Sequence, residues 1–349
     1  DNMKKRVVIT GLGVVAPNGV GVAAFLNAIR NGISGIRFDA ELERLQFSCQ
    51  ISGTPQIADA MKEDNFTPLE LRNFNASGIL YGVMAGIDAW KDAGLPIENN
   101  NEPDWDSGTI FGTGTSGIDK FRESIYKIDD FKTRKLGSTA VAQTMNSGIS
   151  AYLGGKLGLG NQVTTNASAC TTGTESILMA YDRIVSGQAK RVLAGSTSDS
   201  GPYIWGGFDA MKVCTFKHNN QPEKGSRPMS ATASGFVPGS GAGALVLEDM
   251  ETAMARGAKI YAEVLGGNCN SGGQRGEGTM TAPNAMAVQK CIQDALKNSG
   301  ISASEIDAIN GHLTATIKDS LEISNWATAL DRNGKSFPYI NSLKSMVGH

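Results

Sequence analysis

The sequence predicts an α/β fold made of two similar halves. Short β-branched and apolar runs alternate along the chain with longer segments whose apolar residues recur at helical spacing. Near Lys259 this pattern starts again, and the second series of strands and helices follows an order similar to the first, without a residue-level repeat. Alternating strands and helices favour buried, mainly parallel strands. We therefore expect a first half over residues 1–258 and a second half over residues 259–349.

The composition is that of a globular protein with balanced charge. Of the 349 residues, 40% are hydrophobic and 19% are charged, and the formal net charge is −2. This balance gives no reason to expect a nucleic acid or an anionic membrane as partner, and no apolar run approaches the length of a membrane span. Five cysteines without a CxxC pair do not indicate a disulfide framework. We expect a cytoplasmic protein, since such cysteine usage is typical of a reducing compartment.

Two glycine-rich stretches in the first half each follow a predicted strand. The strand over 6–10 runs into residues 11–19, and the strand over 108–111 runs into residues 112–117. Both stretches resemble part of a dinucleotide-binding fingerprint. However, the first has a Pro-Asn pair where a helix should run, and neither has a well-placed acidic residue about 20 positions further on. We interpret both stretches as turns.

The rest of the first half alternates helices and strands. A polar, mixed segment over 113–137 is hard to assign and is compatible with a helical excursion over a pocket. The remaining predicted elements are helices over 75–93, 147–157 and 251–257 and strands over 191–194 and 244–248, with a turn at 195–198.

The second half continues this alternation. Its predicted elements are a strand over 260–265, a helix over 284–296, a capping box from Ser302 to Glu305, and strands over 307–310 and 338–342. The last two strands lead to His312 and Lys344.

One cysteine lies between a predicted strand and a predicted helix. Residues 162–174 start as a β-branched run, continue as small residues around Cys170 and open into a helical pattern that stops at Gly187. The N-terminus of that helix would favour a thiolate, and its amides could receive an oxyanion. The alternative is a buried small hydrophobic residue, the usual role of a cysteine outside disulfides. The stretch by itself leaves both interpretations open.

The chain has three histidines. His218 lies in a polar loop, which indicates a surface residue. His312 and His349 each follow a short strand through a turn, the position at which α/β folds collect their sites. Together with Cys170 they form a candidate set for nucleophilic catalysis. Zinc is the competing use of these residue types, but close ligand pairs are missing from the sequence, so we predict no metal site.

A set of further segments, spread over essentially the whole chain, points to a known family. They are Cys170 with its neighbours 169–174, Gly207-Phe208, Ser226-Arg227-Pro228, 235–237, 241–243, 256–263, Asn310-Gly311-His312, and 344–349 from Lys344 to His349. In this order the segments resemble the β-ketoacyl-acyl-carrier-protein synthases, most closely the type II elongating enzymes of fatty-acid synthesis.

This resemblance implies a thiolase-like fold, in which two pseudo-symmetric α/β halves stack as five αβαβα layers, normally in a homodimer. It also implies a decarboxylative Claisen condensation in fatty-acid elongation. An acyl chain moves from the acyl carrier protein to the cysteine, and malonyl-carrier protein then condenses with it and loses CO₂. The phosphopantetheine arm of the carrier protein holds the substrates, so the resemblance implies no cofactor of the enzyme's own.

The resemblance also implies roles for matching residues of the site. Cys170 matches the nucleophile, and His312 and His349 match the donors that stabilise the enolate. Lys344 matches the lysine that tunes the imidazoles, and Glu322 matches the acid that usually anchors this lysine.

Other matches concern the substrate and the carrier protein. The positions that match the pantetheine tunnel and the acyl pocket are Thr314, Thr316, Thr281, Phe208 and Thr115. The helix near residues 66–74 usually carries several basic residues for an acidic carrier protein, and here Arg72 is the clear one. Lys212 matches another basic docking position.

The chain also departs from the family pattern. Leu313 stands where the family has glycine and requires a backbone angle that glycine tolerates more easily. Asp319 comes one residue early, and Glu175 places an acid one turn into the nucleophile helix. The closing helix, the last strands and a Gly-Phe-Gly loop do not follow His349, so we expect the second half to be incomplete.

Three alternatives to housekeeping elongation stay open. One is a specialised ketosynthase of a polyene or polyketide pathway, which would work as a heterodimer with a related subunit. Another is a non-catalytic chain-length partner, although such partners usually lose the nucleophile that Cys170 represents. A degradative thiolase is the third, but its second reactive cysteine is replaced here by a second histidine.

Overall fold

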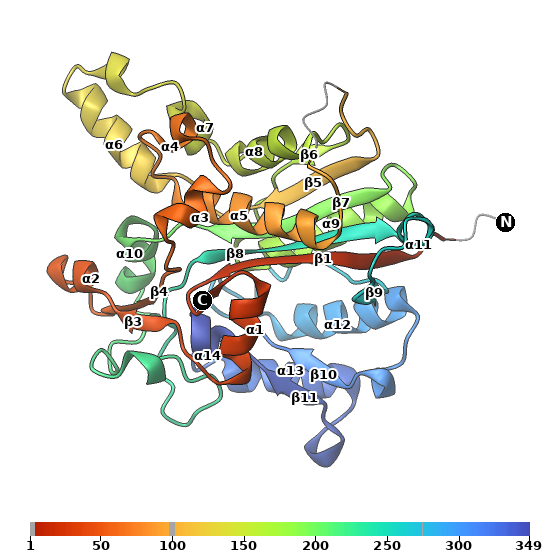
Figure 1. The fold of residues 1–349 in the computed structure, drawn as a ribbon. Helices are drawn as coiled ribbons and strands as arrows, with labels where there is room; N and C mark the ends of the chain where they lie inside the picture. Colours follow the sequence, from red (N-terminus) through yellow and green to blue (C-terminus); the bar gives the residue numbers. More distant parts are fainter. Residues whose placement is uncertain (1–3, 98–101, 274) are drawn as a thin grey trace. The chain divides into compact units, whose positions relative to one another are not determined.

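The computed structural model describes residues 4–97, 102–273 and 275–349 (Figure 1). These residues form two compact units. Unit 1 consists of the described residues of Asp1–Gly35, Thr54–Gly207 and Gly239–Val264, and unit 2 consists of the described residues of Ile36–Gly53, Phe208–Pro238 and Leu265–His349. Each unit therefore combines distant stretches of the chain. The division of the sequence at residues 258/259 stays a prediction.

A mixed sheet of seven strands forms the centre of unit 1. Its order is β2 (Gly19–Val20), β1 (Val7–Ala16), β8 (Gly241–Asp249), β7 (Arg191–Ser198), β5 (Ser107–Gly112) and β6 (Val163–Thr164), and β9 (Ala262–Val264) also pairs with β1. The β5–β7 and β5–β6 pairs are parallel, whereas β1 and β8 pair antiparallel with all their partners among these strands.

The prediction of mainly parallel strands is therefore wrong for this sheet. A two-residue turn joins β1 to β2, and such a turn can connect only antiparallel strands. The parallel pairs are β5 with β6 and β5 with β7, and β6 leads into the segment that carries Cys170. The predicted turn at 195–198 is also wrong, because β7 continues through these residues.

The first glycine-rich stretch belongs mostly to β1 rather than to a turn. Gly13 faces α5 (Ser77–Asp92), and a side chain here would place its Cβ 1.9 Å from the carbonyl oxygen of Ala85. The missing side chain therefore lets the helix pack directly on the strand. The predicted turn is confined to Pro17 and Asn18.

The helices α5 and α9 (Thr172–Val185) cover opposite faces of the sheet (Figure 1). Leu193 and Val246 pack in the hydrophobic cluster of α5, whereas the adjacent residues Val192 and Leu247 pack in the cluster of α9. Successive residues of a strand point to opposite faces, so the two helices sandwich these strands. Both helices were predicted from their apolar spacing, and both are confirmed.

Unit 1 contains several shorter helices. They are α1 (Val22–Arg30), α3 (Asp59–Glu63), α4 (Pro68–Leu71), α6 (Ile118–Asp129), α7 (Ala140–Thr144), α8 (Gly148–Leu157) and α11 (Met250–Ala255), and α10 (Pro202–Ala210) begins in this unit. α8 and α11 confirm predicted helices, and α6 shows that the polar segment over 113–137 does contain a helix. Within the part of the chain that the structure describes, no helix is both long and apolar enough to cross a membrane.

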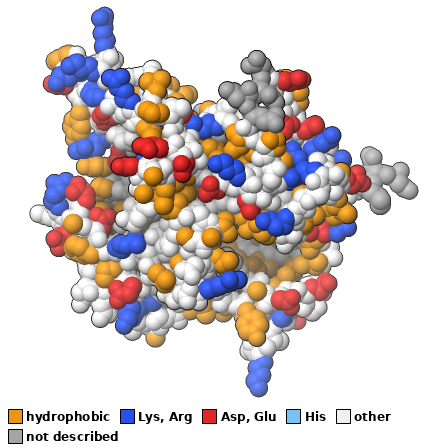
Figure 2. Space-filling view, in the orientation of Figure 1, with side chains coloured by type: hydrophobic (Ala, Val, Ile, Leu, Met, Phe, Trp, Pro, Cys, Tyr) orange, Lys and Arg blue, Asp and Glu red, His pale blue; other side chains and the backbone are white. Residues whose placement is uncertain are grey.

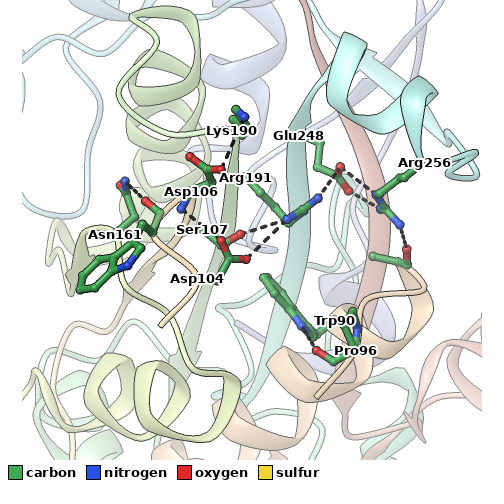
Figure 3. A network of polar contacts seen from close by, with 12 residues as sticks. Trp90, Pro96, Asp104, Asp106, Ser107, Asn161, Lys190, Arg191, Glu248 and Arg256 are labelled. Atoms are coloured by element: carbon green, nitrogen blue, oxygen red, sulfur yellow. Dashed lines mark hydrogen bonds and ion pairs between the residues drawn. The ribbon is translucent and has the colours of Figure 1, made fainter. Parts of the chain in front are cut away.

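A buried polar network fastens the end of α11 to the sheet (Figure 3). The side chain of Glu248 is 0% exposed and accepts hydrogen bonds from Thr10 Oγ1 at 2.7 Å, from Arg191 Nη2 at 3.2 Å and from the guanidinium of Arg256. Arg256 also donates to the Ala93 carbonyl at 2.7 Å. Burial acts to raise the pKa of Glu248, but the hydrogen bonds and the arginine charges outweigh it and lower the pKa.

Unit 2 is built from shorter elements. Its strands are β3 (Ile36–Phe38) and β4 (Ile51–Gly53), which pair antiparallel, and β10 (Ala308–Asn310) and β11 (Tyr339–Asn341), which pair parallel; its helices are α2 (Ala40–Arg44), α12 (Ala285–Ser299), α13 (Asp319–Leu330) and α14 (Lys344–Val347). The predicted capping box at Ser302 and Glu305 is present. The predicted strands that lead to His312 and Lys344 are confirmed as β10 and β11.

Candidate active site

Cys170 lies in a tight turn between β6 and α9. The residues Ala169–Thr171 form one turn of 3₁₀ helix, and α9 starts at Thr172. Ala169 has φ 51°, a left-handed conformation that sharpens the turn. The predicted position of the cysteine at a helix N-terminus is confirmed. The side chain is exposed, which excludes the buried hydrophobic role.

Neutral hydrogen bonds hold this turn in place. The Asn166 amide donates to the Thr172 carbonyl at 3.0 Å and accepts from Ser176 Oγ at 2.7 Å. The Thr172 hydroxyl accepts from the Ser168 amide at 2.9 Å and donates to the Ala169 carbonyl at 2.7 Å. These bonds fix the backbone on both sides of Cys170.

In unit 2, Glu322 holds the loop that carries His312. Its carboxylate accepts hydrogen bonds from the backbone N–H of His312 at 3.0 Å and of Leu313 at 2.8 Å, and from Trp326 Nε1 at 3.3 Å. Leu313 is fully buried and has φ 26°, which confirms the prediction of a backbone angle that suits glycine. These contacts show that Glu322 shapes the loop that carries His312. The anchoring of Lys344 by Glu322 stays a prediction.

Asp319 is a second clamp of the same loop, and sequence reasoning missed its role. The side chain is buried, and its carboxylate accepts from the backbone N–H of Thr314 and of Ala315 at 3.1 Å each and from that of Met229 at 3.0 Å. Ala315 also has a left-handed φ, of 70°. The available signal was an aspartate at a helix start after a threonine-rich loop, a position that suits the capping of backbone amides.

Four aromatic rings form a continuous series through unit 2. The rings of His312 and His349 meet edge to face with their centroids 5.0 Å apart and an interplanar angle of 84°. His349 meets Phe236 in the same way at 5.0 Å and 89°, and Phe236 meets Phe208 at 5.7 Å. The backbone N–H of His349 donates to the Val237 carbonyl at 2.7 Å. Phe236 lies in one of the segments that resemble the family, residues 235–237, but the sequence assigned it no role in the site.

The surroundings lower the pKa of both imidazoles. Partial removal from water is the main cause at His312, and the charge of Lys344 adds to it, against the opposite effect of two carboxylates. At His349, burial, the neighbouring His312 and Lys344 lower the pKa to about 3. Lys344 Nζ donates to the His312 carbonyl at 2.6 Å, which places the ammonium beside the histidine loop. Both rings are therefore neutral at pH 7, and each then has one N–H donor.

The residues matched to the substrate lie in different places. Thr314 and Thr316 belong to the clamped loop, where Thr314 Oγ1 donates to Thr316 Oγ1 at 3.2 Å. Phe208 belongs to the ring series. Thr281 is exposed in a separate loop of unit 2, and its backbone N–H donates to Thr279 Oγ1 at 3.2 Å. Thr115 is exposed in unit 1, in the turn after β5, so the second glycine-rich stretch is a turn as predicted.

The two residues matched to carrier-protein docking are exposed. Arg72 follows the short helix α4, and Lys212 follows α10 in a left-handed turn with φ 60°. Cys170, Thr115 and Arg72 belong to unit 1, whereas the histidines, Lys344 and Lys212 belong to unit 2.

Two family models match nearly the whole chain. The model of the β-ketoacyl synthase N-terminal domain matches residues 4–253, and the model of the C-terminal domain matches residues 261–349. The chain belongs to the β-ketoacyl synthase family. The family predicted from the sequence segments is thereby confirmed.

Relatives of this synthase occur in bacteria and in plastids. The chain is 33% identical to the chloroplastic 3-oxoacyl-[acyl-carrier-protein] synthase I of Arabidopsis thaliana, over 99% of the chain and 72% of the relative. It is 32% identical to the 3-oxoacyl-[acyl-carrier-protein] synthase 2 of Vibrio cholerae, over 99% of the chain and 82% of the relative.

Solved ketosynthase structures share the fold of this synthase. The AntDE:AntF complex, a type II PKS acyl-carrier protein with its ketosynthase, matches with a TM-score of 0.84 and 29% identity over 99% of this chain and 83% of that one. The ishigamide ketosynthase/chain length factor matches with a TM-score of 0.85 and 27% identity over 99% and 82%. The predicted α/β fold of the thiolase-like ketosynthases is confirmed; the arrangement of its halves in five layers stays a prediction.

Proposed function

We propose that this family member is a β-ketoacyl-acyl-carrier-protein synthase that elongates acyl chains in fatty-acid synthesis. The observation that carries the proposal is the neutral imidazole pair of His312 and His349 beside Lys344. Such a pair offers two N–H donors to one oxyanion. The same chain presents an exposed cysteine at a helix start, and relatives over its full length are named 3-oxoacyl-[acyl-carrier-protein] synthases.

In the first proposed step, the Cys170 thiolate attacks the thioester carbonyl of an acyl chain on its carrier. A bond forms between Sγ and the carbonyl carbon, the bond to the pantetheine sulfur breaks, and the pantetheine thiolate leaves. The amides at the start of α9 point toward the Cys170 turn and suit an oxyanion that forms there.

In the second proposed step, malonyl-carrier protein loses CO₂ and condenses with the acyl group. The electron pair of the breaking C–CO₂ bond forms an enolate on the thioester oxygen, and the N–H donors of His312 and His349 stabilise that charge. The α-carbon then attacks the acyl carbonyl, a C–C bond forms, and the bond to Cys170 breaks to regenerate the thiolate. These hydrogen bonds become stronger only when the enolate forms. They therefore stabilise the transition state more than the bound substrate, and this accelerates the reaction.

Separate assays of the two steps test this proposal. His312→Ala or His349→Ala is expected to leave acyl transfer to Cys170 intact and to abolish malonyl decarboxylation, because only the second step generates the enolate. Acyl transfer is followed by the mass of the acylated protein, and decarboxylation by release of labelled CO₂. Release of CO₂ at the wild-type rate from either variant would refute the enolate role.

Selective labelling tests the nucleophile. Iodoacetamide is expected to modify Cys170 before the buried Cys49 and Cys214, since burial raises the pKa of both thiols, that of Cys49 to about 11. Cys269 is also exposed and provides a reference for accessibility alone. Labelling of Cys170 no faster than that of Cys269, measured by peptide mass spectrometry, would contradict the assignment.

A basic surface on unit 1 supports docking of an acidic carrier protein. Figure 2 shows Lys and Arg side chains beside hydrophobic ones over α6 and the 3₁₀ turn Thr133–Lys135. Lys132, Arg134 and Lys135 are exposed there. Replacing these three residues by glutamate is expected to raise KM for an acyl-carrier substrate but not for an acyl-pantetheine that lacks the protein. An equal loss with both substrates would contradict docking at this surface.

The remaining parts of the proposal concern assembly and location. We propose that the enzyme works as a homodimer and uses no cofactor of its own, because the carrier's phosphopantetheine brings both acyl groups. A cytoplasmic location stays a prediction, since the relatives include chloroplastic and mitochondrial proteins as well as bacterial ones.

A specialised ketosynthase that pairs with a related subunit is the second candidate. The observation that favours it is the similarity to the ishigamide ketosynthase/chain length factor and to the AntDE:AntF complex. An elongation assay with acyl-carrier substrates of graded length separates the two candidates. Repeated elongation by the chain alone supports the homodimeric fatty-acid enzyme, whereas activity only after addition of a second subunit supports the specialised one.

A further inference from the structure

An acidic residue contacts the nucleophile turn in unit 1. Glu175 lies in the first turn of α9, and its carboxylate accepts a hydrogen bond from Thr171 Oγ1 at 2.8 Å. Thr171 directly follows Cys170 and also donates to the Ser168 carbonyl at 2.8 Å. The carboxylate is thus hydrogen-bonded to the residue that follows the cysteine.

The charge of Glu175 opposes the effect of the α9 N-terminus on the ionisation of Cys170. The partial positive charge at the N-terminus of α9 favours a thiolate on Cys170, but a carboxylate in the same first turn compensates that charge. The negative charge of a carboxylate in the turn that follows Cys170 also disfavours ionisation of the thiol. The other side chains that hold the turn are neutral, namely Asn166, Thr172 and Ser176. From the neighbouring strand β7, the neutral Ser196 faces Gly173.

We propose that Glu175 sets the ionisation of Cys170, so that at neutral pH the thiolate fraction is smaller than the helix N-terminus alone would give. The inference rests on the proposed function in one respect, that Cys170 is the nucleophile. His312, His349 and Lys344 of unit 2 also take part in the proposed reaction, and a comparison of Glu175→Gln with the wild type leaves these three residues unchanged. Because Cys170 is exposed, the smaller thiolate fraction also slows its oxidation between turnovers.

The chain offers variants that separate the charge of Glu175 from its hydrogen bond. Glu175→Gln removes the charge but keeps an oxygen that can accept from Thr171. Thr171→Val removes the hydroxyl but keeps the carboxylate. Asp182→Asn makes the same change of charge further along α9, on an exposed residue, and serves as the control.

The experiment is the pH dependence of the iodoacetamide reaction at Cys170, followed by peptide mass spectrometry with Cys269 as the internal reference. Glu175→Gln is expected to shift the profile of Cys170 to lower pH by about half a unit, with alkylation about threefold faster at pH 7. Asp182→Asn is expected to leave it unchanged, and Thr171→Val is expected to shift it less than Glu175→Gln does.

Two results would overturn the inference. One is a Glu175→Gln profile that coincides with that of the wild type. The other is an equal shift with Thr171→Val, which would assign the effect to the turn rather than to the charge. Both differ from a failure of the proposed function, in which wild-type Cys170 would show no preferential labelling at any pH.

Discussion

Asp319 offers the sharpest test of how the histidine loop is held. One carboxylate oxygen accepts from the Thr314 amide, and the other accepts from the amides of Ala315 and Met229. In Asp319→Asn, the better orientation of the new amide keeps the oxygen toward Ala315 and Met229. Its NH₂ group then faces the Thr314 N–H, so one bond is lost and two donors oppose each other.

The expected cost follows from this geometry. A buried hydrogen bond to a charged group contributes about 1.5–3 kcal/mol, and the two bonds that remain become neutral and weaker. We therefore expect Asp319→Asn to destabilise unit 2 by about 2–4 kcal/mol and to lower the urea midpoint of unfolding. Asp331→Asn at the other end of α13 is the control, because Asp331 is exposed in a left-handed conformation that asparagine also tolerates.

Function provides a second measurement on the same variant. Displacement of the loop moves His312, so malonyl decarboxylation is expected to fall, whereas alkylation of Cys170 in unit 1 is expected to persist. A variant that unfolds at the wild-type urea concentration and decarboxylates at the wild-type rate would refute the clamp.

Three further outcomes are expected. Glu248→Gln should destabilise unit 1 by about 3–5 kcal/mol in urea unfolding, because it removes the fully buried negative charge that Arg191 and Arg256 share. Glu263→Gln, in an exposed pair with Arg6, should have a much smaller effect; equal losses would contradict this. Leu313→Gly should lower stability by about 1–3 kcal/mol, since the loss of a fully buried side chain outweighs the relief of its φ of 26°; a rise in the melting temperature would show that strain dominates. The pKa of His349 is lowered to about 3 in the folded protein, so on acidification the unfolded chain binds the proton at a higher pH than the folded one. Stability should therefore fall as pH decreases from about 6.5 to about 3. His349→Phe should reduce this dependence of the melting temperature on pH, and an unchanged dependence would mean that other groups control it.

The sequence predicted best those features that depend on neighbouring residues. The turn of Cys170 could be predicted because a β-branched run, small residues and a helical pattern follow one another directly. The capping box at Ser302 and Glu305 is local in the same sense. The strands β10 and β11 were found because short apolar runs end at residues of evident chemical use.

Features that depend on distant residues were missed. The sequence around Gly13 predicts a turn. Glycine is needed there because the strand packs against the backbone of α5, which begins more than 60 residues later in the chain. The direction of β8 beside β1 depends on pairing across the whole of unit 1. The clamp by Asp319 includes the Met229 amide, 90 positions away. Sequence periodicity carries no information about such partners.

Electrostatics in the two units act on different steps of the proposed reaction. In unit 2, burial and the Lys344 charge lower the pKa of both imidazoles, so both rings keep their N–H donors at neutral pH. In unit 1, the Glu175 carboxylate opposes ionisation of the thiol. Decarboxylation should therefore depend little on pH in the neutral range, whereas acyl transfer should rise with pH as the Cys170 thiolate forms. A complete cycle limited by acyl transfer would show the titration of the cysteine, and one limited by decarboxylation would show a flat profile, so the pH profile of elongation identifies the slower step.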